Sequence, residues 1–290
     1  MKKLTTIKTF AFSLLIFSLL LQNLSPLQAQ TPTNDINAQI RKEGMENSQI
    51  MRTIHFFSDV YGPRLTGSPN HKAAANWAVK QMLTWGFDSA QLEAWDFGHP
   101  GWVNERASGF ITAPVEDSLV FEVLAWTPGT KGAVKSQAFQ MNLPERPTQE
   151  ELTAYFNSVK SQVADKMILM GKPAAIPVNL NPPPKRLDDE TVRRRLDPTA
   201  TPQPFPAPPT PIAPKPGQLS FPQIAEQLDK FLIDNRAAVR INDAGREHGQ
   251  IRAFNNRTFD VTKVVPTVVM RNEDFGRIGR LLADGTAVSL

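Results

Sequence analysis

The sequence predicts an α/β protein, because amphipathic helical segments alternate with short apolar segments. Apolar residues recur at helical spacing in segments 69–84, 148–163 and 272–282. Short apolar runs at 166–171 and 264–270 are typical of buried strands. The 290 residues are 41% hydrophobic and 21% charged, which is enough for a real core and for one large or two ordinary domains.

The charge balance gives no sign of a nucleic-acid or membrane-surface protein. The formal net charge is +4. Lys2, Lys3 and Lys8 supply three of these charges and residues 1–29 contain no acid, so the rest of the chain is nearly neutral. We therefore expect no nucleic-acid partner.

Residues 1–29 are typical of a secretory signal peptide. The basic start is followed by an apolar run, Phe10 to Leu21, that is short for a membrane span, and Leu27-Gln28-Ala29 offers a cleavage site. The alternative is an uncleaved membrane anchor. The chain has no Cys, so no disulfide framework can form. We expect a secreted or periplasmic protein without membrane contact after cleavage.

A shaped loop, Tyr61 to Pro69, separates two predicted helices. It contains two Gly and two Pro in nine residues, which excludes a helix or a strand. The preceding helical pattern covers 35–60. The following helix, 69–84, begins with Ser68 as N-cap and Pro69 at its first position. We expect Arg64, the only charge in the loop, to anchor it.

Residues 91–134 predict a small antiparallel set of strands. Segment 91–97 alternates polar and apolar residues, and segments 107–112 and 118–126 are two further candidates. Thr127 to Gly132 is a turn rich in Pro and Gly.

The second half of the chain differs in composition from the first. Thr148 and Glu151 form a capping-box pattern at a helix start. Segment 173–222 holds fifteen of the 25 prolines. Within it Lys185 to Leu196 is a charged helical patch, and Pro198 to Pro216 predicts extended, polyproline-II-like chain. This stretch is interpreted as a surface excursion, with a docking site for a proline-binding module as the alternative.

Order is expected to return at Phe221 with an amphipathic helix. Strands are predicted at 238–241 and 264–270, a helix at 272–282, and a further strand at 287–290. Because the chain ends inside that last apolar strand, we expect its pairing partners to be left unsatisfied and the chain to be truncated.

The common catalytic patterns are absent from the sequence. It contains no Cys nucleophile, G-x-S-x-G elbow, phosphate-binding glycine loop or H-E-x-x-H pair. The four histidines are His55, His71, His99 and His248. His55 and Asp59 are four apart on a predicted helix and could share a metal, but a hydrogen-bonded pair at the helix end is the more ordinary interpretation.

Two further polar patterns have ordinary interpretations. Asn256-Arg257-Thr258 matches the N-glycosylation acceptor pattern, which arises often by chance. Arg193-Arg194-Arg195 is a basic run, and the preceding acids Asp188 to Glu190 balance it, so a solvated helix face is favoured.

An ordered set of short motifs resembles the secreted two-zinc exopeptidases of peptidase family M28, in the branch that includes plasma glutamate carboxypeptidase (carboxypeptidase Q) and bacterial zinc aminopeptidases. The motifs of the first part are Tyr61–Pro69, Ala73–Ala78, Leu83–Phe87, Gly101-Trp102, Thr112–Pro114 and Thr127–Gly132. From about Ser136 the chain resembles the protease-associated domain inserted in that branch. The motifs there are Lys166–Lys172, Val265–Val269 and the segment Asn272–Leu282.

The resemblance implies the N-terminal part of a zinc-exopeptidase α/β domain, residues 30–135, and an inserted α+β protease-associated-like domain, residues 136–290, whose proline-rich excursion covers 173–222. In that family two zinc ions are held by His, Asp and Glu, and a Glu acts as general base. The first ligands are expected on a strand ending in His-x-Asp, and no His-x-Asp occurs here. We therefore assign no catalytic, cofactor-binding or metal-ligating residue in this chain, and expect the ligands beyond residue 290.

Two functions follow as hypotheses. The first is the N-terminal portion of a secreted zinc-dependent aminopeptidase or carboxypeptidase, inactive alone, with peptides as substrates of the complete enzyme. The second is a non-catalytic secreted binding or lid module based on the protease-associated domain. Self-association into a homodimer stays open in both.

Overall fold

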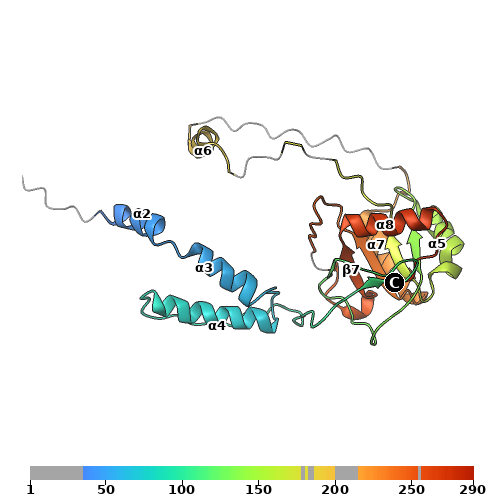
Figure 1. Cartoon of the computed structure of the whole chain (residues 1–290), viewed down its shortest axis with the longest axis horizontal. Coiled ribbons are helices and arrows are strands. Elements are labelled where there is room, and N and C mark those ends of the chain that lie inside the picture. Colours follow the sequence, from blue (N-terminus) through green and yellow to red (C-terminus); the bar gives the residue numbers. More distant parts are fainter. Residues whose placement is uncertain (1–34, 178–179, 182–185, 200–214, 254–255) are drawn as a thin grey trace, which may run out of the picture. The chain divides into compact units, whose positions relative to one another are not determined.

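The computed structural model describes residues 35–177, 180–181, 186–199, 215–253 and 256–290 (Figure 1). The expected signal peptide, residues 1–29, lies outside these ranges and stays a prediction. Within them, no helix is long and apolar enough to cross a membrane. The chain divides into two compact units, one ending at Gly62 and the other beginning at Pro63.

The first unit is helical, as predicted, but it is interrupted. Helices α2 (Ile36–Glu46) and α3 (Ile50–His55) are followed by a π-helical turn, η1 (Phe56–Val60). The interruption covers residues 47–49, between the end of α2 and the start of α3. The side chains of Asn47 and Gln49 bond to Glu43 Oε2 and to the Asn47 carbonyl, which replaces helical bonding there.

Helix α4 (Pro69–Thr84) confirms the predicted start of the second helix. The Ser68 Oγ accepts a hydrogen bond from the His71 amide at 3.1 Å, and Pro69 occupies the first helical position. Gly86 follows the helix with a φ of 91°, a left-handed conformation that suits glycine.

The strands predicted between 91 and 126 are mostly wrong in extent. Residues 91–97 form no strand, and their apolar members Leu92 and Trp95 are 49% and 75% exposed. The physical reason is pairing, because alternation makes a strand only where another strand supplies hydrogen bonds, and none does so within the described residues. The other two candidates shrink to β1 (Phe110–Ile111), β2 (Asp117–Ser118) and β3 (Phe121–Val123).

A five-stranded sheet confirms the α/β class. Its order is β3-β7-β6-β5-β4, where β4 is Ala138–Met141, β5 Met167–Met170, β6 Val239–Asp243 and β7 Thr267–Met270. The last four strands are mutually parallel, whereas β3 is antiparallel to β7. β1 and β2 form a separate antiparallel pair. Strands from both sides of residue 135 thus share one sheet, and the domain boundary expected there stays a prediction.

Helices cover both faces of this sheet: α5 (Gln149–Val163), α7 (Phe221–Asp234) and α8 (Asn272–Ala283) (Figure 1). Met167 and Leu169 of β5 pack in the core that contains α8 residues, while Ile168 packs in the core that contains α5 and α7 residues. This alternation is the period of two expected of a strand buried on both faces.

Residues 288–290 are paired on both sides, which corrects the expectation that their partners would be missing. The Ser289 carbonyl accepts from the Thr112 amide, and the Ser289 amide donates to the Ala113 carbonyl. On the other side Leu290 and Ser136 exchange two hydrogen bonds. Val288 is fully buried and Leu290 is 8% exposed. The segment therefore fills the gap between β1 and β4.

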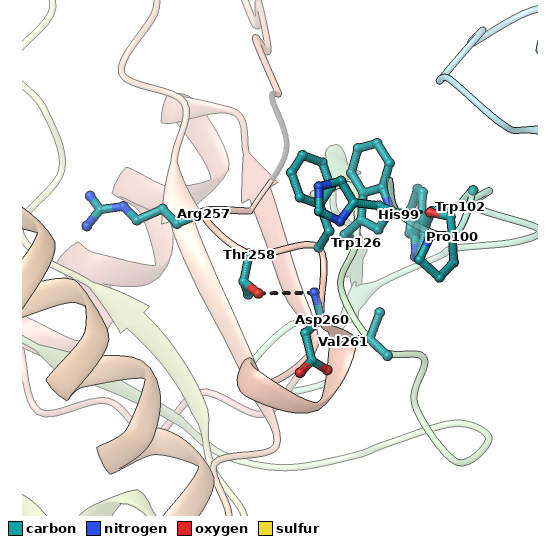
Figure 2. Close-up of a pocket in the computed structure, with 10 residues that line it drawn as sticks. His99, Pro100, Trp102, Trp126, Arg257, Thr258, Asp260 and Val261 are labelled. Atoms are coloured by element: carbon teal, nitrogen blue, oxygen red, sulfur yellow. Dashed lines mark hydrogen bonds between the residues drawn. The ribbon is translucent and has the colours of Figure 1, made fainter. Parts of the chain in front are cut away.

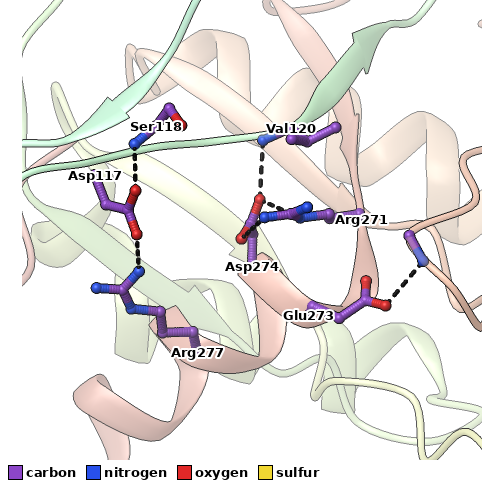
Figure 3. A network of polar contacts seen from close by, with 8 residues as sticks. Asp117, Ser118, Val120, Arg271, Glu273, Asp274 and Arg277 are labelled. Carbon is purple, nitrogen blue, oxygen red and sulfur yellow. Dashed lines mark hydrogen bonds and ion pairs between the residues drawn. The ribbon is translucent and has the colours of Figure 1, made fainter.

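Helix α8 is fixed to the chain before β3 by a polar network (Figure 3). The Asp274 carboxylate, only 5% exposed, accepts from the Val120 amide at 2.9 Å and from two nitrogens of Arg271 at 2.7 and 2.9 Å. These side-chain bonds raise the pKa of Arg271. Nearby, Arg277 binds Asp117 and lowers the pKa of that exposed carboxyl.

The proline-rich region is described only in part. The charged helix predicted at 185–196 is confirmed over α6 (Asp189–Leu196), which has no buried residue. This agrees with a solvated face for Arg193 to Arg195. Most of the stretch from Pro198 to Pro216 lies outside the described residues, so its interpretation stays a prediction. After the stretch, Leu219 donates to the Pro147 carbonyl.

The capping box at α5 gives a direct stability test. The Thr148 Oγ1 accepts from the Glu151 amide, and a Glu151 carboxylate oxygen accepts from the Thr148 amide at 2.8 Å. We expect Thr148→Ala to lower the free energy of unfolding by about 1 kcal/mol, measured by urea denaturation. Thr153→Ala, on the exposed surface of the same helix, is the control and should change it by less than about 0.5 kcal/mol. Equal effects of the two substitutions would contradict a capping role.

Candidate functional site

The structure brings together motifs that are far apart in the sequence. Gly67, in the Tyr61–Pro69 loop, lies against Gly101 so closely that a Cβ built on Gly101 would be 2.2 Å from the Gly67 carbonyl oxygen. Gly67 also has a φ of 76°, which side chains disfavour. Two glycines are therefore required for this backbone contact.

Thr127 connects the next motifs to one another. The Trp102 indole N–H donates to the Thr127 carbonyl at 3.0 Å. The buried Thr127 hydroxyl donates to the Val265 carbonyl at 3.0 Å and accepts from the Thr267 amide at 2.8 Å. Four motifs, at residues 61–69, 101–102, 127–132 and 265–269, are thus joined in one continuous series of contacts.

An open cleft of about 550 Å³ lies beside this series (Figure 2). One wall comes from His99 to Trp102 together with Trp126, and the other from Arg257 to Val261. The first wall includes the motif residues Gly101 and Trp102. The cleft is therefore built where the loop before β1 meets the segment that precedes β7.

Aromatic side chains connect the two walls. His99 stacks on Phe259 with ring centroids 4.0 Å apart and planes inclined by 16°. Phe97 and Trp126 meet Phe259 edge to face at 5.5 and 4.7 Å. Such edge and offset contacts are the favoured aromatic geometries. They attach the otherwise irregular segment 97–102 to the body of the unit.

Trp126 holds an unusual backbone conformation at this place. Its φ is 56°, although the residue is bulky and only 4% exposed. Its indole N–H donates to the Pro100 carbonyl at 2.9 Å. A left-handed conformation of a non-glycine residue costs about 1–3 kcal/mol, so packing and this hydrogen bond hold Trp126 in position.

The charged side chains of Arg257 and Asp260, at the cleft, form different hydrogen bonds. The Arg257 guanidinium donates to the Phe221 carbonyl at 3.2 Å and points away from His99 and Trp126 (Figure 2). Asp260 is exposed, and its Oδ1 accepts from the hydroxyl and the amide of Thr262 at 2.6 and 3.0 Å. These hydrogen bonds lower the pKa of Asp260, so this carboxylate is ionised at neutral pH.

A partly buried ion pair lies close enough to Arg257 to respond to its charge. Arg240 binds Asp229 at 2.8 Å, and the two side chains are 22% and 17% exposed. Burial raises the pKa of Asp229 more than the charge of Arg240 lowers it. The pair joins α7 to β6 and faces no described cleft, so we assign it a structural role.

The four histidines do not gather at one site. His55 Nδ1 is 2.7 Å from Asp59 Oδ2, which is the helix-end surface pair expected as the ordinary interpretation. His71 lies in the first turn of α4, and exposed His248 is near Glu247. Only His99 belongs to the cleft. Within the described ranges no three His, Asp or Glu side chains gather as a metal site, so the residues present do not fit a zinc centre.

Asn256 is a poor glycosylation acceptor in the folded chain. It is 8% exposed, and its backbone N–H donates to the Ala125 carbonyl. Its side-chain Nδ2 has no hydrogen-bond partner among the described residues. Its burial favours a chance match of the sequence pattern.

No sequence pattern identified residues 257–261 as the wall of a cleft. Phe259 and Asp260 lie in a polar stretch without periodicity, and only the tertiary contact with His99 identifies them. Trp126 was placed in a strand, and its left-handed φ instead turns the chain at the end of that segment. The expected anchoring role of Arg64 stays a prediction.

Comparisons with solved structures give partial similarities. They include a peptidase M28 precursor from Shewanella amazonensis SB2B (TM-score 0.43, 14% identity, 87% of this chain and 48% of that one). An aminopeptidase from Aneurinibacillus sp. strain AM-1 has a TM-score of 0.38 and 12% identity, over 86% of this chain and 43% of that one. A zinc aminopeptidase from Bacillus subtilis has a TM-score of 0.37 and 11% identity, over 82% of this chain and 40% of that one. The chain spans less than half the length of each. At these TM-scores the similarity does not assign the chain to that family. No protein-family model and no curated protein matches the sequence.

Proposed function

We propose that the chain is the N-terminal portion of a secreted zinc-dependent exopeptidase, including its protease-associated-like domain. The observation that supports this most is the continuous series of contacts from Gly67 through Gly101, Trp102 and Thr127 to Val265. Each motif is weak by itself. Their direct contact is what a shared ancestral scaffold requires, whereas chance matches would be scattered over the molecule.

This portion supplies scaffold, and no catalytic step is assigned to its residues. In the proposed enzyme, zinc would polarise the scissile carbonyl and activate a water molecule, using ligands carried by a further part of the protein. The substrates are peptides trimmed at one end, and aminopeptidase and carboxypeptidase activity are both compatible with the scaffold.

The purified chain should bind less than 0.1 equivalent of zinc, about the background of a protein without a metal site, because its described residues offer no set of three ligands. It should also release no amino acid from a panel of dipeptides. Zinc is measured by atomic emission after dialysis against a weak chelator. Two tightly bound equivalents would overturn the assignment of the ligands to another part of the protein.

The positive test is a longer product, expressed with the coding sequence that follows Leu290. We expect it to bind two zinc ions and to cleave dipeptides, with activity lost on chelation and restored by zinc. A following sequence that encodes no His-x-Asp strand, or a longer product without peptidase activity, would contradict the proposal.

A second candidate is a free-standing secreted binding module. The two cores favour it, because both faces of the five-stranded sheet are covered by α5, α7 and α8 of this chain. A single cooperative unfolding transition of the purified monomer, together with no gain of activity in the longer product, would select this module. Aggregation of the isolated chain would exclude it.

A further inference from the structure

Helix α6 is exposed along its whole length. It has no buried residue, and its two apolar side chains, Val192 and Leu196, are 37% and 77% exposed. Within the described part of the chain, the side-chain hydrogen bonds and ion pairs of residues 186–196 join only residues of that range. A helix of eight residues is marginal in water, because most helix stability in proteins comes from packing. Helix α6 can therefore open locally at little cost in free energy.

The last turn of α6 contains the longest basic run in the sequence, Arg193-Arg194-Arg195. Adjacent basic residues occur elsewhere only as pairs, at 2–3, 41–42 and 185–186. The three arginines are exposed, and none of them forms an ion pair within the described ranges. Endopeptidases specific for basic residues bind an extended segment of chain and place its positive side chains in acidic subsites. An opened α6 supplies such a segment.

The parts of the chain before and after α6 are joined by strand pairing as well as by the backbone. Strand β5, before α6, pairs with β6, after it, and β3 pairs with β7 in the same way. Residues 288–290 pair with 112–113 and with Ser136. Both hydrophobic cores contain residues from each side of the helix. A break within α6 would therefore leave every one of these pairings and both cores in place.

The segments that lead into and out of this region are also fixed to the sheet and its helices. The Ala174 amide donates to the Asp243 carboxylate at 2.7 Å, and the Ala174 carbonyl accepts from the Asn272 side chain at 3.0 Å. On the return, the Leu219 amide donates to the Pro147 carbonyl at 2.9 Å. These hydrogen bonds hold both ends of the region whether or not the chain between them is continuous.

We propose that α6 is a proteolytic processing site, cleaved at the Arg195–Leu196 bond by an endopeptidase specific for consecutive basic residues. Water adds across this amide bond, which leaves a carboxylate on Arg195 and an amino group on Leu196. The product is a two-chain protein that stays one folded body, because strands from both fragments share one sheet. The inference rests on α6 and the strand pairing, and it does not depend on the proposed function.

The test is a timed digestion of the full chain in native buffer with a subtilisin-type endopeptidase that cleaves after paired basic residues. Mass spectrometry locates the cut, and size-exclusion chromatography follows the product. We expect a C-terminal fragment that begins at Leu196 and elutes together with the N-terminal fragment. The two fragments should separate when the product is unfolded in urea. Absence of this cut, a cut in this region only after Arg186, or separation of the fragments in native buffer overturns the proposal.

A triple variant connects the cut to the arginine run. Arg193→Gln, Arg194→Gln and Arg195→Gln together should slow the formation of the Leu196 fragment by at least about tenfold, because the basic side chains that the endopeptidase recognises are gone. The thermal midpoint should stay unchanged, since all three residues are exposed. Cleavage of this variant at the wild-type rate contradicts the assignment of the site.

A second variant tests whether the absence of packing selects α6. Ser161→Arg creates a basic pair with Lys160 on the exposed side of α5, close to the end of that helix. Leu152, Val159 and Val163 are buried and hold α5 on the sheet, so this pair should be cut at least about tenfold more slowly than the bond in α6. Cleavage of both sites at the same rate would show that exposure alone is sufficient, and would remove the special role of α6.

Discussion

Gly101→Ala should lower the free energy of unfolding of the Pro63–Leu290 unit by about 3 kcal/mol, the largest effect that we expect from a single methyl group in this chain. The new Cβ would lie 2.2 Å from the Gly67 carbonyl oxygen and 2.6 Å from its carbon. Both are backbone atoms, which cannot move aside as a flexible side chain can. Urea denaturation followed by fluorescence measures the change, and an unchanged m-value keeps the comparison valid.

Gly129→Ala is the matched control for this substitution. Gly129 lies in the turn after Trp126, and a Cβ built there meets no atom within 4 Å. We expect a change of less than about 0.5 kcal/mol. Gly67→Ala should resemble Gly101→Ala, since its Cβ would approach Gly101 Cα to 2.9 Å at a φ of 76°. Near-neutral behaviour of both contact glycines would mean that the loop does not pack on Gly101 in solution.

Asp274→Ala should lower the free energy of unfolding by about 3 kcal/mol. The substitution leaves the Val120 amide without its acceptor and the Arg271 guanidinium without a carboxylate, at a site where Asp274 is 5% exposed. Asp274→Asn keeps an acceptor for Val120 and should lose less. Thermal and urea denaturation of both variants measure the difference.

Asp117→Ala removes the neighbouring ion pair and serves as the control. Its partner Arg277 and Asp117 itself are 37% and 51% exposed, so solvent screens the attraction and the loss should stay below about 1 kcal/mol. An effect of Asp117→Ala as large as that of Asp274→Ala would show that the buried amide of Val120 is not what makes the network costly to break.

Local signals predicted the helices well. Ser68 with Pro69, and Thr148 with Glu151, mark the starts of α4 and α5 because a cap is completed by residues within one turn. The buried strands β5 and β7 were also found, since a strand buried on both faces is apolar throughout. The strand predicted at 91–97 does not form, because a strand also depends on residues that are distant in the sequence. Its alternation is real, but pairing depends on a partner from elsewhere in the chain.

The candidate site was only half visible in the sequence. Gly101 and Trp102 were noticed as part of a motif, whereas Phe259, Asp260 and the left-handed Trp126 carry no local signature. Phe259 reaches the cleft through contacts with His99 and Trp126, which are more than 100 positions away in the sequence. The same limit applied to residues 288–290, whose partners at 112–113 and 136–138 no periodicity could indicate.

By itself the sequence determined the α/β class, the helix starts, the buried strands and the absence of the common catalytic patterns, because each depends on composition or on neighbours within a few residues. Tertiary structure alone decided that Gly67 lies on Gly101, that Thr127 joins Trp102 to β7, and that an aromatic cleft lies beside them. Backbone approach and side-chain convergence are set by the packing of whole elements, which no local pattern encodes.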